Sequence, residues 1–365
     1  MRQGTNVAWR ARALISRSAL MHNIAAIRTF SRTAKLYGVV KADAYGHGIA
    51  QLAECEPALD GFAVATIEEG IELRQLISNT TPIIVLSEFN HRDQLSLFQQ
   101  YRLQLVIHHI EQLDWLESNE FACGNNLLAA WIKLDTGMNR LGFPMEMADG
   151  LMQRFQSLSH VEHCGIMSHL ASADEPDNKQ TRLQFQAFTQ LQRFSLPLMS
   201  LNNSAGILTL EHSSSSMVRP GILLYGACPI PDYQHHFIPV MTFQSRLIDI
   251  KKIEAGDLVG YGGTWASGQA TRIGVIACGY ADGYPRLASN RGQVFIGTKK
   301  ADIAGRVSMD TMVVDLTGHH TAARGDIVEL WGKHIPVRLV ADWSETIPYE
   351  LLCKVGNRVP RVSVE

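Results

Sequence analysis

The sequence predicts an α/β chain that begins with a TIM-like (β/α)8 barrel and ends in a mainly β domain. From about residue 16 to residue 225, short apolar runs alternate with stretches whose apolar residues recur at helical spacing. Strands that are apolar throughout and alternate with helices indicate a parallel sheet that is covered on both faces. After about residue 235 the helical stretches nearly disappear. The 365 residues also exceed one ordinary core, so two domains are expected.

Eight apolar runs are the candidate strands of the barrel. They cover residues 35–40, 61–65, 83–86, 105–107, 127–134, 163–167, 198–201 and 217–219. Two intervening stretches carry clear helix signals, because Ser16 and Thr66 stand as caps before apolar residues at helical spacing. Eight such units over about 210 residues fit a closed barrel better than an open, doubly wound sheet.

The C-terminal third of the chain has a β pattern. Its alternating or β-rich runs, broken by Gly and Asp, cover residues 241–253, 271–280, 292–297 and 310–316. One helix is expected at residues 337–343. We therefore divide the chain into a barrel of residues 11–235 and a β domain of residues 236–365. Residues 1–10, which contain VAWR, are a candidate for an additional strand of the β domain.

The composition gives no sign of a nucleic-acid or membrane partner. The net charge is −2, so no basic surface for phosphate backbones or anionic lipids is expected. No apolar run approaches the ~20 residues that cross a bilayer, and the N-terminus lacks the apolar core of a secretory signal. The six cysteines form no C-x-x-C pair, which favours buried thiols over disulfides or a metal site. A reducing, cytoplasmic location is therefore expected.

Lys41 is the first candidate for catalysis. It follows the apolar run that ends at residues 38–40, and catalytic groups of a βα barrel project from the carboxyl ends of its strands. Apolar surroundings would make its amine a good nucleophile toward an aldehyde. A solvated lysine at a strand end is the competing interpretation. Gly46 and Gly48 then predict a tight turn that suits an anion.

Eight motifs give the chain a resemblance to one known family. They are VVKADAYGHG (39–48), KLDTGMNRLGF (133–143), MSHLASAD (167–174), NNSAGIL (202–208), VRPGILLYG (218–226), GYADGYPR (279–286), GRVSMDTMVVDL (305–316) and YELLCKVGNRVPR (349–361). Each resembles a segment of the alanine racemases, and the segments follow in family order. The resemblance implies the same fold, pyridoxal 5′-phosphate (PLP) as cofactor, and interconversion of L-alanine and D-alanine.

The resemblance also implies a cofactor site. Lys41 would carry PLP as an aldimine and act as one of two acid/base groups. The residues around the phosphate would be Tyr45, Ser204, Gly221, Ile222 and Tyr349. The backbone N–H groups of residues 221–222 are expected to open a helix after Pro220, which is a natural anion site. For Ser204, a role as helix cap is the competing interpretation.

Arg219 matches the arginine that faces the pyridine nitrogen, and His169 matches the residue that supports it. Because a guanidinium only donates hydrogen bonds, it pairs with an unprotonated ring nitrogen. Such a ring is a weaker electron sink, which would limit decarboxylation and transamination while permitting brief deprotonation at Cα. Taken alone, His169 is typical of a structural histidine at a strand end.

Arg140 matches an arginine near the cofactor O3′ and the substrate carboxylate. Lys133 matches a lysine that is often carbamylated in the family. A carbamate is negative and would fix Arg140 by a charge-assisted pair, whereas an unmodified Lys133 would need another partner.

Tyr280 matches the second base of the family. Two bases on opposite faces of Cα exchange its proton without turning the substrate. Met309 and Asp310 match residues whose backbone lines the substrate carboxylate. In the family these three residues reach the site from the other subunit, so the resemblance implies a homodimer with shared active sites. Tyr261 and Tyr284 are expected near the entrance.

Three alternative functions compete with this interpretation. A racemase of broader specificity, or one for serine, would share the fold and differ in the pocket near Cβ. A non-catalytic PLP-homeostasis protein would resemble the barrel alone, and the β domain with Tyr280 argues against it. A PLP decarboxylase would place an acid at the ring nitrogen, where this chain has Arg219. Supply of D-alanine for peptidoglycan and catabolism of D-alanine are both open as roles.

Overall fold

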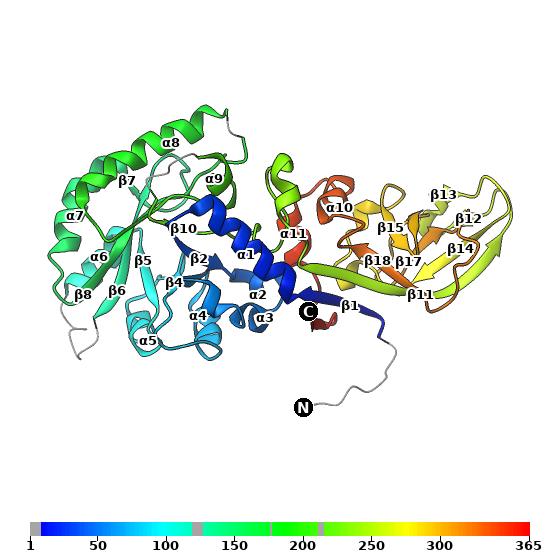
Figure 1. Ribbon diagram of the computed structural model, residues 1–365, viewed down its shortest axis with the longest axis horizontal. Coiled ribbons are helices and arrows are strands. Elements are labelled where there is room, and N and C mark those ends of the chain that lie inside the picture. The colour runs from blue at the N-terminus through cyan, green and yellow to red at the C-terminus, as the bar shows by residue number, and fades with distance from the viewer. Residues whose placement is uncertain (1–8, 119–126, 176, 211–214) are drawn as a thin grey trace. The chain divides into compact units, whose positions relative to one another are not determined.

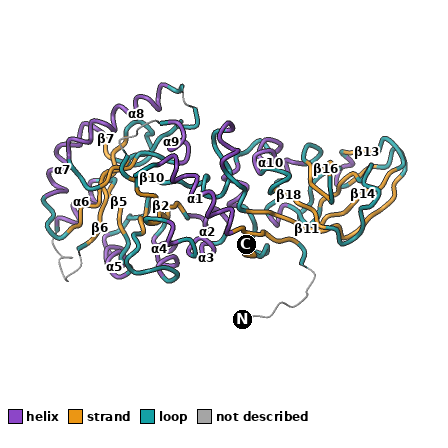
Figure 2. The backbone as a smooth tube through the Cα atoms, viewed as in Figure 1, coloured by secondary structure: helices purple, strands orange, loops and turns teal. Residues whose placement is uncertain are grey.

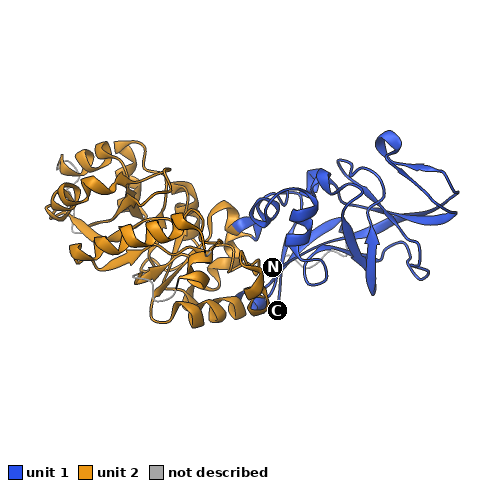
Figure 3. Ribbon diagram, turned by 90° about the horizontal axis from the view of Figure 1, so that it is seen from above, with its two compact units in different colours: residues 1–20, 45–47, 238–365 blue, residues 21–44, 48–237 orange. Residues whose placement is uncertain are grey.

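The computed structural model describes residues 9–118, 127–175, 177–210 and 215–365. The described chain divides into two compact units, which are coloured separately in Figure 3. One comprises residues 21–44 and 48–237, and the other comprises residues 9–20, 45–47 and 238–365. We call them the barrel unit and the β unit. Among the helices so described, none is long and apolar enough to cross a membrane.

A parallel sheet of eight main strands forms the centre of the barrel unit as far as the described residues show it (Figure 1). Its order is β10-β2-β3-β4-β5-β6-β8-β9, and the short β7 pairs with the end of β6. The strands are β2 (Lys35–Val39), β3 (Gly61–Val64), β4 (Ile83–Val85), β5 (Gln104–Ile107), β6 (Leu128–Asp135), β7 (Phe143–Pro144), β8 (Val161–Met167), β9 (Leu198–Ser200) and β10 (Met217–Val218). All eight predicted strands are present, so the predicted barrel is confirmed.

Hydrogen bonds across β9 and β10 draw the two ends of this sheet together. The Ser216 hydroxyl accepts from the backbone N–H of Met199 at 2.8 Å. The Ser215 hydroxyl accepts from the backbone N–H of Leu201 at 3.0 Å. Serine hydroxyls thus replace a backbone ladder at this point, and the barrel is nearly closed.

Helices surround the barrel strands (Figure 1). They are α1 (Arg17–Ser31), α2 (Lys41–Gly46), α3 (Ile49–Ala53), α4 (Ile67–Arg74), α5 (Leu95–Gln100), α6 (Ile110–Glu117), α7 (Ala148–Gln156), α8 (Lys179–Thr189) and α9 (Ser204–Thr209). The predicted cap Thr66 begins α4 as part of a capping box with Glu69. Phe62, Ile84 and Ile132 on the strands have no exposed surface, because helices and barrel interior cover both faces of the sheet.

The β unit is built on the long strand β11 (Met241–Ile253), where polar and apolar residues alternate. This strand pairs antiparallel with β1, β14 and β18, and Figure 2 shows the strands in orange. The other elements are β12 (Leu258–Val259), β13 (Trp265–Ala266), β14 (Thr271–Ile276), β15 (Gln293–Ile296), β16 (Lys299–Asp302), β17 (Met312–Asp315), β18 (Ile327–Trp331), α10 (Val337–Trp343) and α11 (Pro348–Cys353). The predicted mainly β C-terminal domain is confirmed.

The N-terminal strand β1 (Ala11–Ser16) lies between β11 and the last strand, β19 (Arg361–Val364). Residues 1–10 are the predicted candidate for an additional strand, whereas the observed strand starts at Ala11, from where buried and partly buried residues alternate. Residues 1–8 lie outside the described residues. The strand therefore belongs with the β unit, whereas the division at residue 11 assigns it to the barrel. The boundary at residue 235 remains a proposal.

Candidate active site

The turn that begins at Lys41 has an unusual backbone. Lys41 is the first residue of α2, and each of the residues Ala42 to Tyr45 has φ between 51° and 54°, in the left-handed region. L-residues avoid left-handed helix at a cost on the order of 1–2 kcal/mol each, so this strained turn is held by its surroundings. Gly46 ends it with φ 75°, and a Cβ there would lie 2.1 Å from the Leu352 carbonyl oxygen. Glycine is therefore required at this position.

Glu69 holds the strained turn from outside. Its Oε1 accepts from the backbone N–H of Ala42 at 2.6 Å. Its Oε2 accepts from the backbone N–H groups of Ala65 at 2.7 Å and Thr66 at 3.3 Å. Hydrogen bonds to a carboxylate are stronger than those between neutral groups. One side chain thus ties the start of α4 to the residue next to Lys41.

Three cationic side chains, Lys41, Arg140 and Arg219, act electrostatically on Lys133 at the carboxyl ends of the barrel strands, which we call the barrel mouth. Lys133 is only 8% exposed. Burial, and then the positive charges of Arg219 and Arg140, lowers the pKa of Lys133 to about 8, and Lys41 acts in the same direction. Asp135 opposes this shift. The excess of positive charge makes the barrel mouth a site for anions.

Arg219 is buried at the end of β10 and contacts His169. Its Nη1 donates to the carbonyl and the hydroxyl of Ser200, and its Nη2 donates to the Ser168 carbonyl at 2.6 Å. His169 Nδ1 lies 3.4 Å from Nη2. Burial, followed by the charge of Arg219, lowers the pKa of His169 well below its usual value, so the neutral ring accepts this contact. Contacts among the described residues engage both terminal nitrogens and leave the Arg219 Nε–H for another acceptor.

Ser204 faces the turn that follows β10. Its hydroxyl accepts from the backbone N–H of Gly221 at 2.9 Å and of Leu223 at 3.4 Å. The competing interpretation of Ser204 as a helix cap is wrong, because the Asn203 side chain caps α9 by accepting from Gly206 N–H at 3.0 Å. The serine hydroxyl therefore contacts the N–H groups of that turn instead of capping α9.

The helix expected after Pro220 does not form. Residues 221–226 are a run of turns, closed by hydrogen bonds such as Leu224 N–H to the Gly221 carbonyl at 3.0 Å. Gly226 ends the run with φ 80°, so no further helical turn can follow. Ile222 lies within this run and is 1% exposed. The anion site proposed from the sequence is thus a turn with closely spaced N–H groups rather than a helix N-terminus.

Arg140 follows β6 on a turn that Asp135 shapes. Asp135 Oδ1 accepts from the backbone N–H groups of Gly137 at 2.8 Å, Met138 at 2.9 Å and Asn139 at 3.2 Å. A carboxylate that binds successive N–H groups of its own loop fixes the course of the backbone. The orientation of the exposed Arg140 therefore depends on Asp135.

Tyr280 starts a short 3₁₀ turn (Tyr280–Asp282) in the β unit. Its N–H donates to the Ser308 carbonyl at 3.0 Å, and the Ala281 N–H donates to the Met309 carbonyl at 3.0 Å. The side chain of Tyr280 is therefore presented beside the Met309 backbone. The two residues are 43% and 52% exposed. Within the β unit the structure thus brings together Tyr280, Met309 and Asp310.

Other tyrosines of the β unit have different positions. The rings of Tyr45 and Tyr349 pair, with centroids 6.1 Å apart, and burial raises the pKa of Tyr45 above its usual value. Tyr261 is 71% exposed. Tyr284 has no exposed surface and stacks on Trp331 with ring centroids 6.2 Å apart, and its place near an entrance stays a prediction. A large aromatic ring stabilises the unit more by this burial than by exposure.

The sequence interpretation missed Glu69, Asp135 and Asp282. All three act by accepting hydrogen bonds from backbone N–H groups. The capping pattern at the start of α4 signals Glu69 as a cap. It does not signal the second bond to Ala42, because that bond depends on the left-handed turn.

Comparison with known proteins agrees with the fold. The model of the alanine racemase N-terminal domain matches residues 15–229, and that of the C-terminal domain matches residues 240–363. A catabolic alanine racemase of Pseudomonas aeruginosa is 42% identical over 356 residues, which cover 96% of this chain and 98% of that protein.

Solved structures give the same result. The biosynthetic alanine racemase from Pseudomonas aeruginosa superposes with a TM-score of 0.92 at 38% identity, covering 98% of this chain and 99% of that one. The alanine racemase from Bartonella henselae, described with covalently bound pyridoxal phosphate, superposes with a TM-score of 0.90 at 30% identity, covering 98% of this chain and 100% of that one. The chain is therefore an isomerase that belongs to the alanine racemase family.

Proposed function

We propose that the protein interconverts L-alanine and D-alanine with PLP bound at the barrel mouth, and that Lys41 and Tyr280 are its two bases. The observation that carries the proposal is the cationic cluster at the barrel mouth. There, Lys133 is buried among the positive charges of Arg219, Arg140 and Lys41. Such a cluster suits the phosphate of a cofactor and the carboxylate of an amino acid.

The donor set of the barrel unit fits PLP. The Ser204 hydroxyl and the N–H groups of Gly221 and Ile222 would hold the phosphate, and by resemblance Tyr45 and Tyr349 would complete its surroundings. The remaining Arg219 donor would face the ring nitrogen and keep it unprotonated. PLP, when bound, withdraws electrons from the Cα of an attached amino acid and so acidifies the Cα–H bond.

The side chains then divide the work of proton transfer. Lys41 would hold the cofactor covalently and take the Cα proton of the D-isomer, and Tyr280 would take that of the L-isomer. Arg140 and the backbone of Met309 and Asp310 would bind the substrate carboxylate.

Two neighbouring side chains, His169 and Lys133, would hold Arg219 and Arg140 in position. His169 contacts Arg219 and would fix its orientation. Lys133, whose pKa is lowered to about 8, would react with carbon dioxide as the neutral amine, and the resulting carbamate would pair with Arg140.

We also propose that the active protein is a homodimer in the cytoplasm. Tyr280 and the apolar Met309 are half exposed on the β unit, which supports their use toward a second subunit. Both a biosynthetic and a catabolic relative match the chain over nearly its full length. Supply of D-alanine for peptidoglycan and catabolism of D-alanine both fit these relatives.

The test is an assay of the purified protein with PLP. We expect a yellow protein that racemises both isomers of alanine and is much slower on serine. Borohydride reduction should fix the cofactor to the peptide that contains Lys41. Absence of alanine racemisation from a protein that binds PLP at Lys41 would overturn the proposed reaction, and labelling of another lysine would overturn the proposed site.

A further inference from the structure

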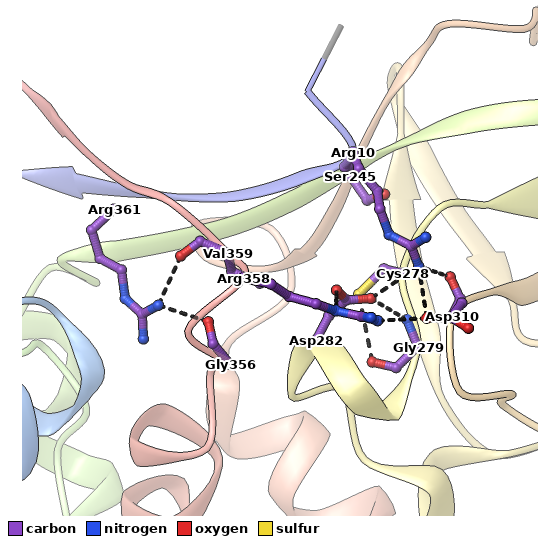
Figure 4. A network of polar contacts seen from close by, with 10 residues as sticks. All are labelled: Arg10, Ser245, Cys278, Gly279, Asp282, Asp310, Gly356, Arg358, Val359 and Arg361. Atoms are coloured by element: carbon purple, nitrogen blue, oxygen red, sulfur yellow. Dashed lines mark hydrogen bonds and ion pairs between the residues drawn. The ribbon is translucent and has the colours of Figure 1, made fainter.

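Asp282 is a buried carboxylate beside Tyr280. Its side chain is 1% exposed, and it accepts from one donor of its own turn and from two arginines that are distant in the sequence (Figure 4). These are the Gly279 N–H at 2.9 Å, Arg358 Nε at 2.6 Å and an Arg10 terminal nitrogen at 3.3 Å. Two of its partners are therefore guanidinium groups, one near each end of the chain.

The same two arginines reach the segment that carries Met309. Arg358 Nη2 donates to Asp310 Oδ1 at 2.8 Å. Arg10 donates to the Asp310 backbone carbonyl and lies 3.7 Å from its carboxylate. Figure 4 shows both guanidinium groups between Asp282 and Asp310. Two positive and two negative groups thus form one network, which we call the charge clamp (Arg10, Asp282, Asp310 and Arg358).

The backbone around Tyr280 leaves little room for adjustment. A Cβ at Gly279 would lie 2.2 Å from the Ser308 carbonyl oxygen, and a Cβ at Gly356 would lie 2.8 Å from the Ala281 carbonyl oxygen. The Gly356 N–H donates to the Asp282 carbonyl at 3.0 Å. Three backbone segments are thus packed against one another, and the charge clamp joins all three by side chains.

We propose that Asp282, Arg10 and Arg358 are positioning residues that set the orientation of Tyr280 and of the Met309–Asp310 backbone. The inference rests on the proposed function in taking Tyr280 as one of the bases. Charge-assisted bonds to a buried carboxylate are strong and directional, and a carboxylate that loses a partner there is left poorly compensated. Weakening the clamp loosens the turn of Tyr280 and leaves the barrel mouth intact.

Arg358→Lys is the sharpest test of this inference. A lysine keeps the positive charge, but a single ammonium cannot reproduce two planar donors directed at two carboxylates. Arg154 offers a matched control, because it bridges Glu117 at 2.7 Å and Asp114 at 2.5 Å in the barrel unit. Arg154→Lys therefore makes the same chemical change at an arginine that lies outside the proposed site.

Two measurements separate positioning from a general loss of structure. The first is amide hydrogen exchange of the peptide that contains residues 279–281, which needs no activity. The second is exchange of the Cα proton of L-alanine and of D-alanine with deuterated solvent by the PLP-loaded enzyme. For Arg358→Lys we expect amide exchange of this peptide to become at least about tenfold faster. We expect Cα-proton exchange to become at least about tenfold slower for L-alanine and to stay nearly unchanged for D-alanine. Arg154→Lys should change none of these.

Asp282→Asn provides a second variant with the same expected asymmetry. It keeps the size of the side chain and removes the charge that both arginines share. Equal losses for the two isomers, or no change in either measurement with Arg358→Lys, would overturn the inference. If the native enzyme exchanges neither isomer, the proposed function fails instead, and the amide exchange still decides whether the clamp orders the turn.

Discussion

The turns that carry Lys41 and Tyr280 are fixed in different ways. The first is a strained left-handed turn, held by one carboxylate that accepts backbone N–H groups, and Glu69 lies only 27 residues from Ala42. The second is an unstrained 3₁₀ turn held by ion pairs, and Arg10 lies 272 residues from Asp282. The start of the Lys41 turn is thus held by a side chain that is close to it in sequence. The Tyr280 turn is instead contacted at Asp282 by Arg10 and Arg358, which are much farther away in sequence.

Among the variants, Lys41→Ala in the barrel unit should lower racemisation the most. Lys41→Ala removes the proposed covalent attachment and one base together. We expect racemisation to fall by more than the ~10²- to 10⁴-fold typical of losing one acid/base group. The protein should also lose the covalent label after borohydride reduction, which mass spectrometry of the peptide detects. A covalent label at another lysine would show that Lys41 is not the attachment site, and the comparison of the two turns would then lose its basis.

Tyr280→Phe should remove only the proposed base of the β unit. It removes one oxygen and keeps the packing, so racemisation should fall by ~10²- to 10⁴-fold while PLP stays bound. Exchange of the Cα proton should survive better from D-alanine than from L-alanine, because Lys41 still serves its own face. A loss that merely follows the loss of cofactor would show that the two turns do not act on separate faces.

Glu69→Gln should have a smaller effect, which is confined to the Lys41 turn. The amide keeps one acceptor and places an NH2 group against the N–H groups of Ala42 or Ala65. We expect about a tenfold weaker PLP affinity, measured by titration of the absorbance, with amide exchange of the Tyr280 turn unchanged. Glu68→Gln changes the exposed neighbour on α4 and serves as the control. Equal losses of PLP affinity in both variants would show that the hydrogen bonds of Glu69 do not support the Lys41 turn.

The smallest expected effect is a pH dependence at Lys133. Its pKa is lowered to about 8, so the amine is mostly protonated below that pH and mostly neutral above it. Only the neutral amine forms a carbamate, and carbamate formation should therefore rise as the pH rises through about 8. Carbon-13 NMR with labelled bicarbonate should show the signal in the native protein and not in Lys133→Gln. A signal that is the same in both would place the carbamate elsewhere.

The sequence predicts the barrel well because each strand has its own apolar run and each helix its own spacing. It predicts the β domain and its helix α10 for the same local reason. The turn after Pro220 is predicted as a helix, because proline followed by apolar residues is typical of a helix start, and only Gly226 and the Ser204 contact oppose it. The burial of Tyr284 against Trp331 depends on residues far apart in sequence, and no local pattern reports it.

The placement of β1 between β11 and β19 has a consequence for synthesis. A ribosome releases the N-terminus first, and domains generally fold as they emerge. Strand β1 must wait for both of its partners, the second of which ends at Val364. Arg361 also donates from Nε to the Gly46 carbonyl at 2.9 Å, at the end of the turn that begins with Lys41. A nascent chain that has not been synthesised as far as Arg361 therefore lacks this hydrogen bond to the end of its own lysine turn.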